Sequence, residues 1–272
     1  MRLEILLSCM HQSDDTLVQN SNITGDVLVI NQCDQEGETV YPTRDGRARI
    51  FSNRDRGLTK SRNLAIAKSC ADICLLCDDD EQFTPNYEKV ILDAYGAIPQ
   101  ADIIAFKVMG QPKTLPDRVM QLRFPKLLNV SSWQISFRRD SLINSGVRFD
   151  ELLGAGSGNG AEEELKFLLD CRRAGLKIWY VPTVIATVGQ GDSTWFHGFD
   201  REFFYNRGAT TRYILGIPLA FAYGLFYVIK KYPKYKNNLS HTQAMAALLR
   251  GIKDNKVGQQ RKALDNSRKD PS

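Results

Sequence analysis

A short apolar run that ends abruptly in carboxylates, ADICLLCDDD at residues 71–80, restricts the fold of this chain more than any other feature. Every side chain of its ICLLC part is apolar, so both faces of the strand that it predicts must be buried. Strands buried on both faces are typical of parallel sheets that carry helices on each side. The run therefore indicates an α/β protein.

Apolar runs alternate with segments of helical spacing along the first half of the chain. They predict strands at 3–9, 26–31, 47–51, 73–77 and 101–108, and helices at 58–68 and 85–98, the second with Thr84 as cap and Pro85 as first residue. This alternation predicts a three-layer α/β/α arrangement with a mostly parallel central sheet. Ligands of such sheets bind beyond the carboxyl ends of the strands, where both NQCD at 31–34 and the three aspartates are expected.

The second half of the chain is less regular. It predicts a strand at 131–138, a Gly-rich loop, a helix at 161–174 that stops at Gly175, and a strand at 176–182. The net charge of +5 does not by itself indicate nucleic acid. Three of the six cysteines lie within residues 70–77 with no histidine nearby, so we expect structural thiols. Unpaired thiols and the lack of a signal peptide favour the cytoplasm.

The C-terminal part, residues 213–272, predicts an apolar helical segment followed by a basic tail. No residue from 213 to 229 carries a charge, and the basic segment KKYPKYK follows. One interpretation is a helix that covers the core and precedes a solvated tail. The other is a peripheral membrane contact through residues 213–236, in which apolar side chains enter the headgroup zone and lysines meet anionic lipid. Pro218 and two glycines argue against a helix that spans the bilayer.

The aspartates 78–80 form the candidate metal site. Adjacent carboxylates raise one another's pKa, and a divalent cation such as Mg²⁺ relieves their repulsion while it completes its shell with phosphate oxygens. A solvated acidic turn is the alternative. Arg62, on the preceding predicted helix, is a candidate for a forked contact with a phosphate or base oxygen, although it also fits an ordinary amphipathic helix.

The segment GLTKSRNLAIAKSCADICLLCDDDEQF resembles the family 2 glycosyltransferases, which carry a G-L-x-x-x-R-N stretch and then an apolar strand with a D-x-D-like end. FRRDSLINSGVRFDELLGAGSGNGAEEELKFLLDCRRAGLKIWYVP is similar to the second half of that family, and the match covers roughly residues 3–200. The resemblance implies a GT-A fold with a nucleotide-sugar half at about 1–110 and an acceptor half at about 111–212. It also implies a nucleotide-diphosphate sugar donor with uridine as the default base, a divalent metal (Mn²⁺ or Mg²⁺) and inversion at the anomeric carbon.

The resemblance also assigns roles on the donor side. Asp80 looks like the main metal ligand, and Asp78 or Asp79 would hold the ribose or the metal and its water. Asn31 stands where the family usually has a base-reading aspartate, and Asp34 is a substitute three residues later. A histidine in the position of His197 often completes the metal shell.

Inverting transfer needs a general base that deprotonates the acceptor hydroxyl. The family carries an acidic pair at the start of the helix behind the Gly-rich loop. Aligning Phe167 with the family phenylalanine puts Glu163 and Glu164 on that pair, with Glu164 where an aspartate is usual. Glu162 is the third candidate. Acidic residues in a first helical turn also interact favourably with the helix dipole, which is the structural alternative.

Two other functions remain open from the sequence. A sugar-1-phosphate nucleotidyltransferase shares the three-layer design, but SCMHQSDDT at 8–16 lacks the Gly-rich loop that such enzymes need. A catalytically silent GT-A-like binding protein would not need intact acidic clusters. We therefore expect transfer to a saccharide or lipid-linked acceptor, in polysaccharide or glycolipid synthesis.

Overall fold

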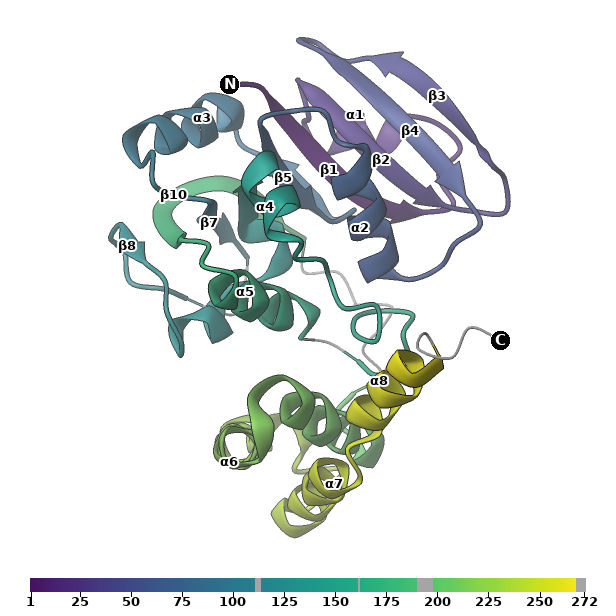
Figure 1. Cartoon of the computed structure of the whole chain (residues 1–272), viewed down its shortest axis with the longest axis vertical. Coiled ribbons are helices and arrows are strands. Elements are labelled where there is room, and N and C mark those ends of the chain that lie inside the picture. Colours follow the sequence, from purple (N-terminus) through teal and green to yellow (C-terminus); the bar gives the residue numbers. More distant parts are fainter. Residues whose placement is uncertain (111–113, 161, 190–197, 268–272) are drawn as a thin grey trace. The chain divides into compact units, whose positions relative to one another are not determined.

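The computed structural model describes residues 1–110, 114–160, 162–189 and 198–267 (Figure 1). The chain divides into two compact units. Unit 1 is Met1–Phe149 with Glu164–Gly191, and unit 2 is Asp150–Glu163 with Asp192–Ser272. The chain therefore leaves unit 1 after Phe149 and returns to it at Glu164.

Unit 1 contains the sheet and the first five α-helices. Its strands are β1 Leu3–Met10, β2 Asp26–Gln32, β3 Gly37–Pro42, β4 Arg47–Asn53, β5 Ile73–Cys77, β6 Glu81–Phe83, β7 Ile103–Met109, β8 Met120–Gln121, β9 Ile135–Arg138 and β10 Ile178–Val188. Its α-helices are α1 Thr16–Asn20, α2 Leu58–Lys68, α3 Tyr87–Ala97, α4 Arg139–Ser145 and α5 Glu163–Arg173, and two 3₁₀ turns are η1 Lys126–Asn129 and η2 Ser132–Gln134.

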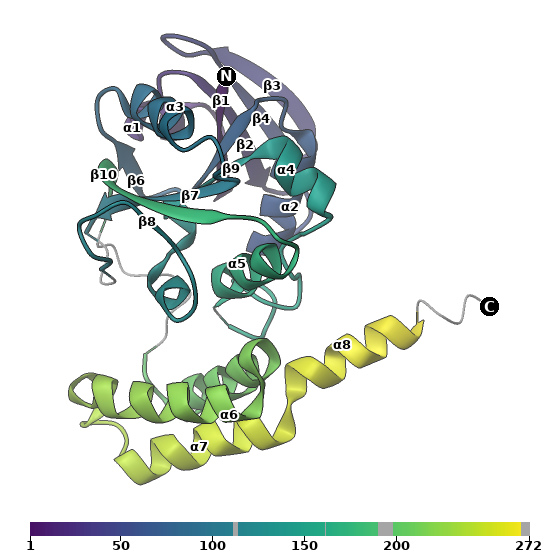
Figure 2. The same cartoon turned by 60° about the vertical axis from the view of Figure 1, so that its left-hand side comes forward.

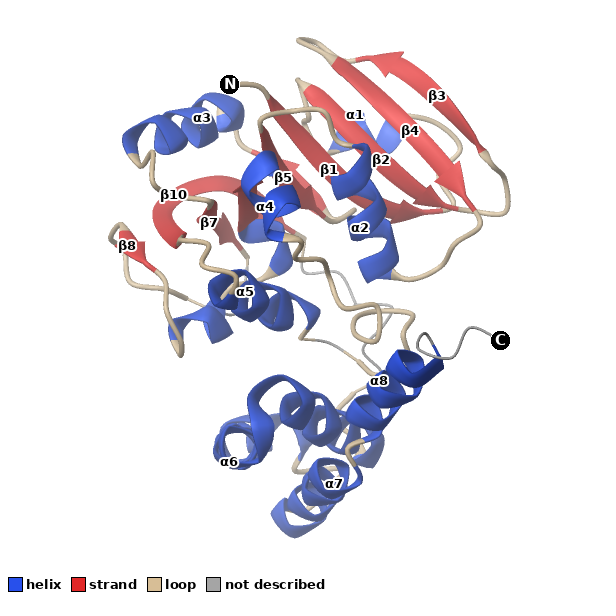
Figure 3. Ribbon diagram, viewed as in Figure 1, coloured by secondary structure: helices blue, strands red, loops and turns tan. Residues whose placement is uncertain are grey.

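Within the described residues, the strands form one ten-stranded sheet in the order β3-β4-β2-β1-β5-β9-β7-β10-β6, with β8 paired to β10 (Figure 3). The run β4-β2-β1-β5 is parallel, and so is the pair β7 and β10. Strand β9 enters antiparallel between β5 and β7. The expected α/β architecture is confirmed, and the sheet is mixed because β9, β3, β6 and β8 run against their neighbours.

Helices cover both faces of the sheet. Figure 2 shows α1 and α3 on one face and α2, α4 and α5 on the other. The core under α3 joins Ile91 and Tyr95 to strand residues such as Ile5 and Leu75, all at most 1% exposed. All five residues of β5 are buried, as the ICLLC run predicts. The α/β/α layering is therefore confirmed, and it places β5 in the middle of the sheet.

Several elements differ in detail from those that the sequence predicts, and the strand expected at 176–182 extends to Val188 as β10. Helix α3 begins at Tyr87, and its cap is Asn86 in the left-handed region (φ 62°). Thr84 instead donates its hydroxyl to the Ile185 carbonyl at 3.1 Å, which joins β6 to β10. The strand expected at 131–138 is confined to β9, because residues 132–134 form the turn η2. Strand β3 was not predicted, since its side chains are almost all exposed and carry no apolar run.

Unit 2 consists of the segment Asp150–Glu163 and three helices, α6 Arg201–Tyr235, α7 His241–Asp254 and α8 Lys256–Ser267. Helix α6 is interrupted at Gly216 (φ 76°, ψ 171°). Residue 212, the predicted end of the acceptor half, lies within the first part of this helix. Helices α6 and α7 pack closely side by side, because a Cβ added to Gly208 or Gly251 would collide with a backbone carbonyl of the partner helix. Ser240 caps α7 with a capping box to Gln243.

Candidate active site at the end of β5

Asp78, Asp79 and Asp80, the acid cluster, follow directly after the central strand β5. Asp78 is 20% exposed in its side chain, and Asp79 and Asp80 are exposed. Partial burial, followed by the charge of Asp78, raises the pKa of the Asp79 carboxyl. The pKa of Asp80 is raised by partial burial and then by Asp78 and Asp79. The expected repulsion within the cluster is therefore present in the structure, and a cation would relieve it.

Arg62 on α2 orients the first member of the cluster. Its side chain is 1% exposed, and Nη2 donates to Oδ1 of Asp78 at 2.8 Å and to Oγ of Ser132 at 2.8 Å. Ser132 also lies 3.4 Å from Oδ2 of Asp78. Removing one partner of such a buried pair typically costs about 3–5 kcal/mol. Arg62 thus reaches the site through Asp78, and its predicted contact with phosphate stays a prediction.

Glu81 is a member of the site that the sequence did not reveal. It is 1% exposed, its Oε1 accepts a hydrogen bond from the Asp78 amide at 2.9 Å, and its Oε2 is buried with no partner among the described residues. Burial, followed by the charge of Asp78, raises its pKa well above the ordinary value. A protonated Glu81 adds no further charge behind the acid cluster. The signal available in the sequence was a fourth acid in DDDE.

The acid cluster fits a divalent ion only in part. No group of three His, Cys, Asp or Glu side chains converges as a metal site within the described residues. A diphosphate-bound Mg²⁺ or Mn²⁺ needs only one or two protein carboxylates, and the exposed Asp79 and Asp80 supply two. His197 lies outside the described residues. The amide of Gly189 donates to the Asp80 carbonyl at 2.9 Å, so the chain passes beside the cluster just before that segment.

The two predicted base-reading residues lie at the end of β2. Asn31 is 1% exposed, and its amide pairs with the backbone of Gln12, with Oδ1 to N at 2.9 Å and Nδ2 to O at 2.8 Å. Nδ2 also donates to Oγ of Ser52 at 3.1 Å. Asp34 is exposed and pairs with Arg56 at 2.6 Å. Asn31 therefore fixes the loop after β1, and direct contact of Asn31 or Asp34 with a base remains a prediction.

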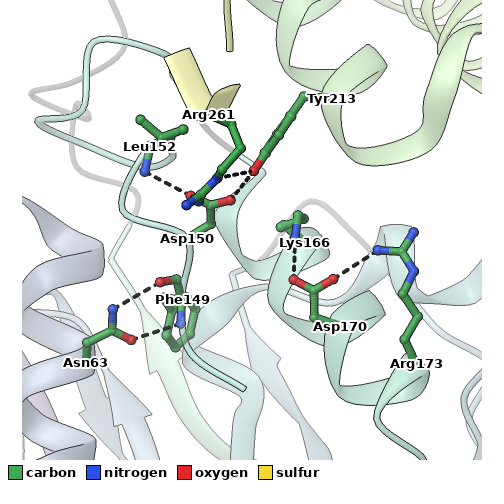
Figure 4. A network of polar contacts seen from close by, with 9 residues as sticks. All are labelled: Asn63, Phe149, Asp150, Leu152, Lys166, Asp170, Arg173, Tyr213 and Arg261. Carbon is green, nitrogen blue, oxygen red and sulfur yellow. Dashed lines mark hydrogen bonds and ion pairs between the residues drawn. The ribbon is translucent and has the colours of Figure 1, made fainter. Parts of the chain in front are cut away.

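Asn63, next to Arg62, holds the backbone of Phe149 in both directions (Figure 4). Its Nδ2 donates to the Phe149 carbonyl at 3.0 Å, and its Oδ1 accepts from the Phe149 amide at 2.8 Å. The Arg62 guanidinium lies 5.5 Å from the centroid of the Phe149 ring. The adjacent Arg-Asn pair of the sequence motif therefore fixes both the acid cluster and Phe149.

Helix α5 carries the predicted general base within unit 1. It begins at Glu163, which is buried, and Glu164 follows with intermediate exposure. Phe167, one turn further, stacks on Phe149. The acid cluster, Arg62, Phe149 and α5 thus form a continuous series of contacts. Both Glu163 and Glu164 lie in the first turn of α5, so the helix-dipole interpretation applies to them as well.

Glu162 precedes α5 and differs in backbone conformation from the two glutamates that follow it. It belongs to unit 2, its backbone is in the left-handed region (φ 84°), and its carboxylate forms an ion pair with Arg207 of α6. The hydroxyl of Tyr223 lies 3.4 Å from the same carboxylate oxygen. A non-glycine residue in this backbone region is strained and persists only where its surroundings hold it. Its contacts with Arg207 and Tyr223 hold this part of the backbone to α6.

The Gly-rich loop between Asp150 and Glu162 is also held within unit 2. Figure 4 shows the Asp150 carboxylate between Tyr213 and Arg261, and the Tyr213 hydroxyl lies 2.5 Å from it. The Asn159 carbonyl accepts from Thr210 at 2.8 Å. These contacts from α6 and α8 were not expected, because the sequence separates Asp150 from Arg261 by 111 positions.

Comparisons with known proteins identify a family model and similar folds. Residues 24–151 match the family model described as Glycosyl transferase family 2. The crystal structure of S. aureus TarS 1-349 in complex with UDP-GlcNAc is 12% identical with a TM-score of 0.61, and the match covers 93% of this chain and 82% of that one. The complex of the same protein with UDP is 13% identical with a TM-score of 0.56, covering 93% and 81%. No curated protein sequence matches the chain.

Proposed function

The chain carries a glycosyl transferase family 2 domain and is a glycosyltransferase, and we propose that it moves a sugar from a UDP-sugar to an acceptor hydroxyl with inversion. The observation that carries the proposal is the series of contacts from the acid cluster through Arg62 and Phe149 to α5. It links a diphosphate-type acidic site to a helix that begins with two glutamates. The family match favours transfer over the nucleotidyltransferase alternative.

The donor side of the proposal uses the acid cluster. Asp80 would hold a divalent ion, with Asp78 or Asp79 as second ligand or ribose contact. A bound divalent ion would neutralise the charge that develops on the departing diphosphate. The likeness to a protein solved with UDP and UDP-GlcNAc supports uridine as the base. Asn31 would shape the base site through Gln12, to which its amide is bonded.

The acceptor side of the proposal uses the first turn of α5. In a single displacement, the acceptor oxygen bonds to the anomeric carbon while the bond to the diphosphate oxygen breaks with its electron pair. The hydroxyl proton passes to a carboxylate, for which we assign Glu164 and, as second choice, Glu163. Glu164 suits this role because it is partly exposed, whereas Glu163 is buried.

A saccharide or lipid-linked molecule is the acceptor class that we propose, in the synthesis of a polysaccharide or glycolipid. The cytoplasm is the proposed location. The acceptor class rests on the family-level resemblance. The location rests on the six free cysteines, of which five are buried.

Thermal denaturation with UDP-, GDP- and dTDP-sugars, in Mn²⁺ and in EDTA, tests the donor proposal. We expect UDP-sugars to raise the Tm only when Mn²⁺ is present, because the ion bridges the diphosphate and the carboxylates. Asp80→Asn should lose that stabilisation. The matched control is Lys89→Gln, which changes an exposed side chain of α3. A UDP-sugar effect that persists in EDTA would refute the metal assignment. A larger effect with GDP- or dTDP-sugars would refute the base assignment.

A further inference from the structure

Helix α6 exposes a continuous apolar face. Six large apolar side chains between Gly216 and Lys230 are each 39–59% exposed: Ile217, Leu219, Phe221, Leu225, Phe226 and Ile229. The helix is long and apolar enough to cross a membrane by composition, yet only 22% of its apolar window is buried. A helix inside a soluble core is mostly buried, so this face has no covering within the described residues.

The opposite face of α6 is already covered. Ala220, Gly224 and Val228 are buried, and a Cβ on Gly224 would collide with the Leu248 side chain of α7. Leu248 itself is 0% exposed. The two helices therefore form a hairpin that buries one side of α6 in its own unit and leaves the other side exposed.

The charge of this hairpin is mostly positive, because its two acidic residues, Glu202 and Asp254, lie at its ends and Asp254 pairs with Arg250. Residues 203–253 contain eight Lys or Arg residues and no Asp or Glu. Arg207 pairs with Glu162, and Arg212 donates to the carbonyls of Ile252 and Lys253. Lys230, Lys234 and Lys236 follow the apolar face directly and are exposed. An apolar face bordered by lysines is complementary to an anionic surface with an apolar interior.

We propose that the apolar face of α6 binds the surface of an anionic lipid bilayer and lies in its plane. A spanning orientation fits less well, because the break at Gly216 leaves only residues 217–229 as continuous uncharged helix. Thirteen residues rise about 20 Å, whereas the hydrocarbon core is about 30 Å thick. A second copy of the chain fits less well, since pairing two such faces brings lysines together. The inference goes beyond the proposed sugar transfer and does not depend on it.

Sedimentation of the full chain with lipid vesicles tests the proposal. We expect binding to vesicles that contain phosphatidylglycerol, and much weaker binding to vesicles of pure phosphatidylcholine. The paired change Phe221→Ser and Phe226→Ser should weaken binding by about tenfold or more, because each buried aromatic side chain is worth about 2 kcal/mol. The control pair is Val40→Ser and Val119→Ser, two exposed apolar residues of unit 1, which should bind as the wild type does.

Lysine variants test the charge separately and do not alter the apolar face. Lys230→Gln with Lys234→Gln should lose about tenfold or more in binding to anionic vesicles, at about 1 kcal/mol per lysine. Lys89→Gln with Lys177→Gln makes the same change in net charge on unit 1 and should have little effect. Equal losses in both lysine pairs, unchanged binding of the serine pair, or no binding by the wild type would overturn the proposal. Self-association without lipid that the serine pair abolishes would identify a second copy as the partner.

Discussion

The ring of Phe149 is stacked on the ring of Phe167, with centroids 4.1 Å apart and planes 5° from parallel. Phe149 also lies under the Arg62 guanidinium, which pairs with Asp78. Phe167 lies one turn after Glu164 on α5. Through this stack, the position of the predicted base depends on the same residues that orient the acid cluster.

Replacing Phe149 with Leu should reduce turnover more than it reduces stability. Loss of the stacked ring removes packing of about 1–2 kcal/mol and lets α5 shift relative to the acid cluster. We expect kcat to fall at least tenfold with little change in KM for the donor, since about 1 Å of misplacement can cost a hundredfold. Phe106→Leu, at another buried phenylalanine of unit 1, is the control. If both variants lose equal stability and equal kcat, the stack has no positioning role.

Glu164→Gln should keep UDP binding and lose turnover by about 10²–10⁴-fold, because the amide cannot accept the acceptor proton. Steady-state kinetics and isothermal titration with UDP and Mn²⁺ measure the two properties separately. Glu163→Gln is the matched variant on the neighbouring position. Full turnover in Glu164→Gln together with loss in Glu163→Gln would transfer the role to Glu163.

The ion pair of Glu162 with Arg207 should contribute to stability and not to proton transfer. Either Glu162→Gln or Arg207→Gln leaves one buried charge without its partner, which costs about 3–5 kcal/mol. The double variant should lose less than the sum of the two single variants. Urea unfolding of the wild type, the two single variants and the double variant gives the coupling energy. Additive losses, or a folded Glu162→Gln protein without turnover, would contradict this assignment.

Glu81 should make unfolding easier as the pH rises above about 4.5. Burial raises its pKa in the folded protein above the ordinary value, so the unfolded chain releases this proton first. The stability that the protonated group contributes is therefore complete below the unfolded pKa. It declines by up to about 1.4 kcal/mol per pH unit until the folded pKa is reached. Urea unfolding between pH 5 and pH 8 measures this slope.

Glu81→Gln is the matched variant for that slope, because a neutral amide replaces a neutral acid of the same shape. The difference in unfolding free energy between Glu81→Gln and the wild type should grow in favour of the variant as the pH rises. Other titrating groups cancel in this difference. A constant difference across the range would mean that Glu81 is ionised in the folded protein.

Local patterns in the sequence predicted the elements that depend on local chemistry. The bounds of α2, the burial of β5 and the place of the acid cluster at its end all follow from apolar spacing and from three adjacent aspartates. Strand β3 was missed because an exposed strand at the edge of a sheet needs no apolar alternation. The strand at β9 was predicted, but its antiparallel direction was not, because strand direction depends on the path of the chain between elements.

Contacts between distant segments could not be predicted in the same way. The Asn63 amide meets Phe149 across 86 positions, and nothing in either neighbourhood specifies the partner. Asn31 could be assigned only by its position after β2, whereas its saturated hydrogen bonds to Gln12 depend on the loop after β1. Likewise, Glu81 gains its raised pKa from burial that the sequence does not show.

The contact between Asp150 and Arg261 has a consequence for synthesis of the chain on the ribosome. Every strand of the sheet has been translated by Val188, so unit 1 can assemble early. Arg261, by contrast, follows Asp150 by 111 positions and lies on α8, so this partner of Asp150 emerges after α6 and α7. Until then, the segment 150–163 has only its contacts with α6, through Tyr213, Thr210 and Arg207, and lacks the ion pair from α8. Nascent chains arrested before residue 261 should therefore be cut by proteases within this segment faster than chains that include α8.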